Sequence, residues 1–181
     1  METIGFLELN SIAKGIEAAD FILKAANVDL LFAKASCPGK YFILFSGEVS
    51  AVRASIDAGL VAGGHYVVDS VVIARIHDQV IKAINLSIEP IEVGAIGVME
   101  FFSVTASVYA ADAAVKAADV TLMDVRLGTG IGGKSFVVLC GEVAAVSEAV
   151  KAATDLSTSN GLLVSSVVIP NPCKEIFESL M

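Results

Sequence analysis

The sequence repeats itself once, and this repeat limits the possible fold more than any other feature. Residues 4–31 match residues 96–123 at a constant offset of 92, with 12 of 28 positions identical. The match continues at offsets of 94 and then 96, so the second copy is slightly longer. A duplication of this extent predicts two similar domains, which we place at residues 1–90 and 91–181.

Each copy has the same predicted order of elements. Short apolar and β-branched runs indicate strands, and apolar residues at helical spacing indicate helices. In the first copy we expect strands at 3–9, 28–35, 41–45 and 67–73, and helices at 11–26, 50–62 and 76–84. This order predicts an α+β fold in which a ferredoxin-like βαββαβ unit is duplicated in tandem without circular permutation.

The composition is unusually apolar for such small domains. Hydrophobic residues make up 55% and charged residues 18% of the chain, and the mean hydropathy is +0.76. The longest stretch without charge, residues 156–173, is interrupted by polar residues and prolines such as Asn160, Pro170 and Asn171, so no membrane span is expected. The surplus of apolar surface instead predicts a protein–protein interface.

Charge and cysteine content exclude other classes of partner. The net charge is −8 and no basic cluster is present, so nucleic acid is not an expected partner. The chain has three cysteines and no secretory segment is expected, which favours a reducing, cytoplasmic location.

One glycine-rich segment matches two nucleotide-binding motifs. Residues 128–135 fit both the P-loop pattern and Gly-x-Gly-x-x-Gly. Both motifs need a helix after the loop, whereas the segment that follows, Phe136–Cys140, is predicted to be a strand. We therefore interpret the segment as a turn whose backbone can approach an axis or a small molecule closely. No catalytic constellation is visible, so we do not expect an enzyme.

Several motifs together resemble a known family. Each copy starts with Ile-Gly-x-x-Glu, followed by Ala-Ala-Asp-x-x-x-Lys-Ala-Ala-x-Val and Gly-Glu-Val, and the second closes on Val-Val-Ile-Pro-x-Pro. This pattern resembles bacterial microcompartment shell proteins of the tandem-domain class, and within them a subunit of propanediol-utilisation compartments. The resemblance implies a homotrimer that mimics a hexamer and tiles with other shell proteins into a compartment wall in the cytoplasm.

The resemblance also assigns roles to two loops. It implies a central pore lined by one loop from each copy. The loop of the first copy contributes Ser36, Pro38 and Gly39, and the loop of the second contributes Gly128, Thr129, Gly130, Ile131 and Gly132. The Cys-Pro-Gly-Lys motif at 37–40 implies that Cys37 is the metal and cofactor ligand, binding an iron–sulfur cluster, [4Fe-4S], with one cluster per trimer. A single cysteine cannot hold such a cluster, but three-fold symmetry brings three together.

The remaining candidates have plainer alternatives. The resemblance implies that Lys24 and Lys116 lie at the edges between trimers, although lysines at helix ends are commonly just solvated charges. Cys140 ends an apolar run and is expected to be buried, and no role is expected for Cys173. A cluster at Cys37 would relay electrons to internal redox enzymes or be transported itself. The alternative is a metal-free trimer whose pore passes or binds a small polar metabolite.

Overall fold

The computed structural model describes residues 3–85, 94–128 and 130–180. Contacts divide the chain into two compact units. The first consists of Met1–Ile76 together with Gly128–Gly133, and the second of His77–Leu127 together with Lys134–Met181. The boundary that we placed between residues 90 and 91 lies outside the described residues.

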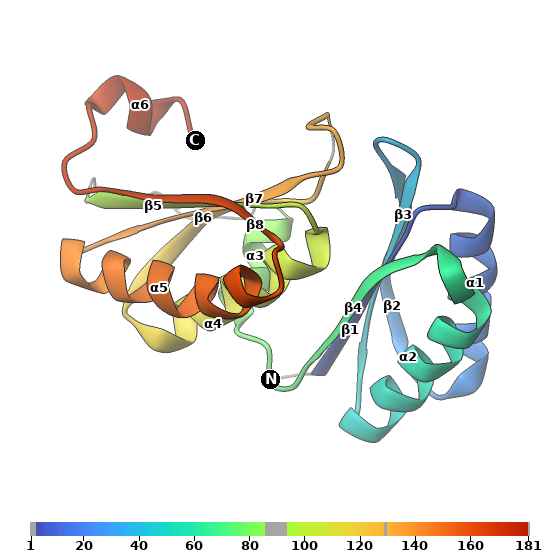
Figure 1. The fold of residues 1–181 in the computed structure, drawn as a ribbon. Coiled ribbons are helices and arrows are strands. Elements are labelled where there is room, and N and C mark those ends of the chain that lie inside the picture. The colour runs from blue at the N-terminus through green and yellow to red at the C-terminus, as the bar shows by residue number, and fades with distance from the viewer. Residues whose placement is uncertain (1–2, 86–93, 129, 181) are drawn as a thin grey trace. The chain divides into compact units, whose positions relative to one another are not determined.

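The first unit is a four-stranded antiparallel sheet with two helices on one face (Figure 1). The strands are β1 (Thr3–Leu9), β2 (Asp29–Ser36), β3 (Lys40–Gly47) and β4 (Val67–Ile73), in the spatial order β2-β3-β1-β4. The helices are α1 (Ile12–Ala25) and α2 (Val49–Gly63). A short 3-10 turn, Gly64–Tyr66, leads into β4.

Local chemistry explains where α1 begins and which face it buries. The Ser11 side chain accepts a hydrogen bond from the backbone of Lys14 and so caps the first turn. Small residues and one isoleucine, spaced along one side of α1, are buried: Gly15, Ala18, Ala19 and Ile22. They pack with apolar side chains of β1, β3 and α2, such as Leu7, Phe45 and Val52, into one core.

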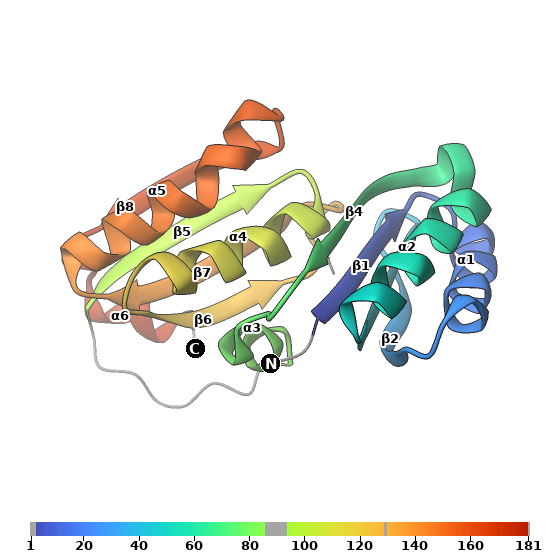
Figure 2. The ribbon, with the colours of Figure 1, turned by 90° about the horizontal axis from the view of Figure 1, so that it is seen from below.

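The second unit repeats this architecture. Its strands β5 (Ala95–Phe101), β6 (Val120–Arg126), β7 (Ser135–Gly141) and β8 (Leu163–Ile169) pair in the order β6-β7-β5-β8. Helices α4 (Val104–Ala117) and α5 (Val143–Ser159) run along one face of this sheet (Figure 2). The predicted tandem α+β fold is therefore confirmed, and both copies keep the same order of elements.

A short C-terminal helix, α6 (Lys174–Glu178), covers the opposite face of the second sheet (Figure 1). Its Phe177 side chain is buried against Ile96, Met123, Val138 and Cys140. The sequence did not predict this contact, because α6 has only five residues, too few to show a helical repeat of apolar positions. The described residues contain no helix long and apolar enough to cross a membrane.

The helix α3 (Asp78–Ile84) differs from expectation in its partner. We assigned the segment to the first copy, but it belongs to the second compact unit. The Gln79 side chain accepts a hydrogen bond from the Leu122 backbone and donates one to the Val120 carbonyl, so it pairs with the edge strand β6. The His77 backbone donates to Asp112 of α4 at 2.8 Å. Thus α3 covers an edge that β6 would otherwise leave open.

Candidate functional site

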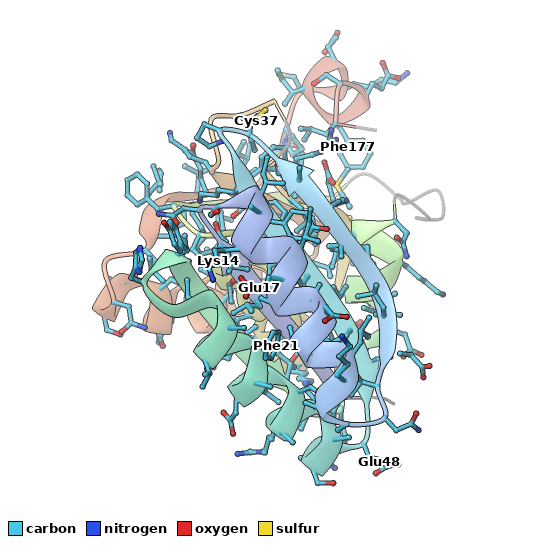
Figure 3. The ribbon with its side chains drawn as sticks, turned by 90° about the vertical axis from the view of Figure 1, so that its right-hand side faces the viewer. Lys14, Glu17, Phe21, Cys37, Glu48 and Phe177 are labelled. Atoms are coloured by element: carbon cyan, nitrogen blue, oxygen red, sulfur yellow. The ribbon has the colours of Figure 1, made fainter. Side chains whose placement is uncertain are left out.

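Cys37 lies at the tip of the hairpin between β2 and β3, with its side chain exposed (Figure 3). The turn is short because the Gly39 backbone donates a hydrogen bond to the Ser36 carbonyl at 2.9 Å. Gly39 has φ +103, a conformation that favours glycine. The Cys37–Pro38 peptide is cis. Figure 3 also shows Glu48 at the far end of the unit, so the thiol is at one extremity.

The glycine loop of the second copy packs on this turn. Its residues 128–133 belong to the same compact unit as Cys37. A Cβ atom on Gly133 would lie 2.7 Å from Pro38 Cδ and 3.1 Å from the Cys37 carbonyl oxygen. Gly133 also has φ +79, so both its backbone and its surroundings require glycine. The glycine loop thus lies close to the Cys37 turn at Gly133, while the predicted approach to an axis or a small molecule stays a prediction.

Positive φ values recur along this loop. They occur at Gly128, Gly130 and Gly132 as well as at Gly133. Gly130 and Gly132 are exposed, and nothing lies within 4 Å of the position where a Cβ would be. Ile131 is half-buried, and Thr129 lies outside the described residues. The segment leads directly into β7 rather than a helix, so it lacks the helix N-terminus that a P-loop needs.

A buried ion pair lies at the base of the Cys37 turn. Lys40 Nζ is 2.6 Å from Glu8 Oε1 and donates a further hydrogen bond to the Gly133 carbonyl oxygen at 3.0 Å. The Lys40 side chain is 16% exposed and that of Glu8 is 0% exposed. Lys40 closes the predicted Cys-Pro-Gly-Lys motif, but its pairing with Glu8 was not predicted from the sequence, although Glu and Lys recur at equivalent positions in both copies.

The equivalent pair in the second copy is arranged differently. Lys134 Nζ lies 2.9 Å from Glu100 Oε1, but these side chains are 43% and 38% exposed. An exposed pair of this kind contributes little to stability, whereas a buried pair fixes the positions of the groups around it. The repeated residues are the same, but only Lys40 is also contacted by the glycine loop, through the Gly133 carbonyl.

The cysteines differ in their ability to bind a metal. Among residues 3–85, 94–128 and 130–180, no group of three or more His, Cys, Asp or Glu side chains is placed to hold an ion. Cys140 is buried, and burial raises the pKa of its thiol above the ordinary 9.0, which disfavours the thiolate. Cys173 is exposed next to α6. Cys37, exposed at a hairpin tip, fits a cluster whose other thiolates come from further copies of the chain.

The two predicted edge lysines lie at the last turns of equivalent helices. Lys24 on α1 pairs with Asp20 at 2.6 Å, and both side chains are exposed. Lys116 on α4 pairs with Asp112, which is buried and also accepts the hydrogen bond from His77. The two lysines are therefore equivalent in sequence but differ in exposure.

Comparison with known proteins assigns this architecture to a family. A model of the BMC domain matches residues 3–76 and again residues 95–172. The bacterial microcompartment shell protein PduT of Citrobacter freundii is 43% identical over 180 residues, which cover 99% of this chain and 98% of that protein.

Two solved structures are similar throughout. A crystal structure of a microcompartment protein from Desulfitobacterium hafniense has a TM-score of 0.87 and 47% identity, covering 98% of this chain and 99% of that one. The fused permuted hexameric shell protein MSM0275 of the RMM microcompartment has a TM-score of 0.66 and 27% identity, covering 87% and 82%. Taken with the duplicated sheets, these matches show that the chain belongs to the BMC-domain family of bacterial microcompartment shell proteins, in its tandem-domain form.

Proposed function

We propose that three copies of this shell protein close into a ring whose central opening is formed by the Cys37 turns. The Cys37 thiolates of the three chains then hold a single [4Fe-4S] cluster on the axis. The ring tiles with other shell proteins into the compartment wall, with Lys24 and Lys116 at the edges between neighbouring rings. When bound, such a cluster supplies one-electron transfer, which serves redox enzymes inside the compartment, or it is cargo that crosses the wall.

The unequal surfaces of the two copies support a ring. Apolar residues of α1 and β2 are exposed in the first copy: Ile12, Ile16, Phe21, Leu23, Leu30 and Leu31. Figure 3 shows Phe21 on α1 beside the solvated residues Lys14 and Glu17. Most residues of the equivalent α4 and β6 are buried within the chain. The first copy thus exposes apolar side chains at positions that the second copy buries.

The second copy exposes a different strand, whose exposed residues are Ser165, Ser166 and Val167. The middle of β8, including Val167, is exposed, while the equivalent residues of β4 are half-buried. An interface that joins two different surfaces head to tail generates a closed ring when the rotation closes. Three chains with two copies each give six similar positions around the axis.

The placement of Cys37 carries the cluster proposal. Its thiol is exposed at the extremity of a hairpin that a loop of the other copy contacts, and among the described residues it belongs to no group of three or more potential metal ligands. Iron–sulfur clusters bind about four soft ligands. One cysteine per chain at this turn can therefore serve this chemistry only when symmetry brings several chains together. In the proposed ring Cys37 supplies three thiolates, and the fourth iron position takes another ligand.

The test is anaerobic purification of the full chain, followed by visible absorbance and an iron assay. The wild type and Cys173→Ser are expected to contain about four irons per trimer, and Cys37→Ser is expected to contain none. Light scattering reports the assembly, which should have three times the chain mass of 18.7 kDa. Equal iron in Cys37→Ser and wild type would remove Cys37 as the ligand.

A metal-free pore is the second candidate, and the glycine loop favours it. Gly130 and Gly132 are exposed and have open space around them, so their backbone amides are accessible to a small polar metabolite. Trimers that purify anaerobically without iron and still form sheets would support this candidate over the cluster.

A further inference from the structure

The loops from the two copies are in contact but differ in chemistry. The first carries the thiol, and the second carries glycines with no metal ligand among its described residues. Three observations connect them: the Gly133 backbone against Pro38, the Lys40 hydrogen bond to the Gly133 carbonyl, and the Lys40–Glu8 ion pair. All three act on the backbone that carries Cys37.

We propose that Gly133, Lys40 and Glu8 are positioning residues that brace the Cys37 turn and so fix where its thiol points. The inference rests on the proposed function for its purpose, since a thiol that must meet its symmetry copies at an axis has to be held in place. The brace itself is a property of one chain and can be tested without iron.

The ammonium of Lys40 is the central element of the brace. The Lys40 ammonium donates one hydrogen bond to Glu8 on β1 and another to the Gly133 carbonyl in the glycine loop. Lys40 is also the first residue of β3, directly after the turn. Because its side chain is nearly enclosed, water competes poorly for these hydrogen bonds, and the charge-assisted contacts keep their strength.

Gly133 supplies the second contact. Any larger residue would place a Cβ against Pro38 Cδ, the Cys37 carbonyl and Lys40 Cε, at 2.7, 3.1 and 3.3 Å. The absence of a side chain lets the glycine loop lie flat on the turn. The brace therefore explains why a glycine is needed here for packing as well as for its positive φ.

The first variant is Gly133→Ala, with Gly161→Ala as its matched control. Gly161 has φ +69 and nothing within 4 Å of its Cβ position, so its alanine has a comparable backbone cost without the clash. The second variant replaces the ion pair by Glu8→Leu with Lys40→Met, because removing Lys40 alone would take the nearby cation away from a fully buried carboxylate and endanger folding. Its control is Glu100→Leu with Lys134→Met, the equivalent exposed pair.

The first readout is the mobility of a nitroxide attached to Cys37, measured by electron paramagnetic resonance in iron-free Cys173→Ser protein. Cys140 is buried and is not expected to react. The spectrum should sharpen in Gly133→Ala and in the Glu8/Lys40 variant, and stay as in the parent in both controls. An unchanged spectrum in both test variants would overturn the brace.

The second readout is the rate at which loaded protein loses iron to a chelator. Residues that orient metal ligands typically change affinity by about 10- to 100-fold, so the two test variants should lose iron at least about 10-fold faster than the controls. If the nitroxide spectra change as expected but wild type never holds iron, the brace stands and the proposed cluster fails. If the spectra change but iron is lost equally from all variants, the brace does not position the ligand.

Discussion

The two copies share one fold and differ mainly in what their equivalent residues face. Ile16 on α1 is 57% exposed, whereas its repeat equivalent on α4, Val108, is 0% exposed. The Glu8–Lys40 pair is buried and the equivalent Glu100–Lys134 pair is exposed. The second copy therefore buries a helix position that the first copy exposes, and the first copy buries an ion pair that the second copy exposes. Changes at paired positions test this difference directly.

The largest expected effect on the protein comes from placing a charged residue at position 108 or at its repeat equivalent, position 16. We expect the first change to affect folding and the second to affect assembly. Val108→Asp buries an unpaired carboxylate and should cost about 3–5 kcal/mol of folding stability, so the chain should precipitate or melt at a much lower temperature. Ile16→Asp should fold normally, because the side chain is exposed in the single chain, but should no longer form trimers.

Calorimetry and light scattering distinguish the two outcomes. Val61→Asp is the control for Ile16→Asp, since Val61 on α2 is the most exposed large apolar side chain among the described residues, at 84%. It should leave both melting and assembly unchanged. If the Ile16→Asp protein is still a trimer, the apolar face of α1 is not an interface between chains.

A smaller effect is expected at α6, which covers the sheet of the second copy. Phe177→Ala removes a buried ring packed on Met123 and Cys140 and should cost about 3–4 kcal/mol. It should also make the Cys140 thiol react with a maleimide in a background of Cys37→Ser and Cys173→Ser. Mass spectrometry of the labelled protein provides the measurement. Continued protection of Cys140 would mean that the sheet, rather than α6, shields it.

The smallest effect is a pH dependence from Cys140. Its pKa is raised in the folded state by burial, so its stability contribution is fully present below the ordinary pKa of 9.0. It is lost as the pH rises from about 9 toward the folded value, because the unfolded thiol ionises first. Cys140→Ser introduces the residue found at the equivalent position, Ser46. Urea midpoints across this pH range should fall less steeply in the variant than in wild type, and identical slopes would contradict the assignment.

Local structure was largely predictable from the sequence. A short apolar run and a β-branched run located the β1 and β4 strands with their observed bounds, and Ser11 was correctly predicted as a helix cap. The strand predicted after the glycine loop is confirmed as β7, and with it the exclusion of a P-loop. These features depend on periodicity and on single-residue chemistry, which act over a few neighbouring residues.

Partners of elements were harder to predict. Nothing in the apolar spacing of α3 says that it packs on β6, because amphipathicity defines a buried face without saying what covers it. Both copies carry Glu and Lys at equivalent positions, yet the Lys40 side chain is 16% exposed and that of Lys134 is 43% exposed. Burial of a charged pair is a tertiary property. The different loop lengths of the two copies were the only signal for it in the sequence.

The position of α3 determines where the chain could be divided into two separate halves. A cut after residue 90 would leave the first half carrying a helix whose partners, Asp112 and Leu122, belong to the other half. The second half would lose the cover of its edge strand, while a cut after Ile76 would keep α3 with its partners. The halves have thus ceased to be interchangeable modules, and fission at the repeat boundary would not regenerate two copies of a single-domain subunit.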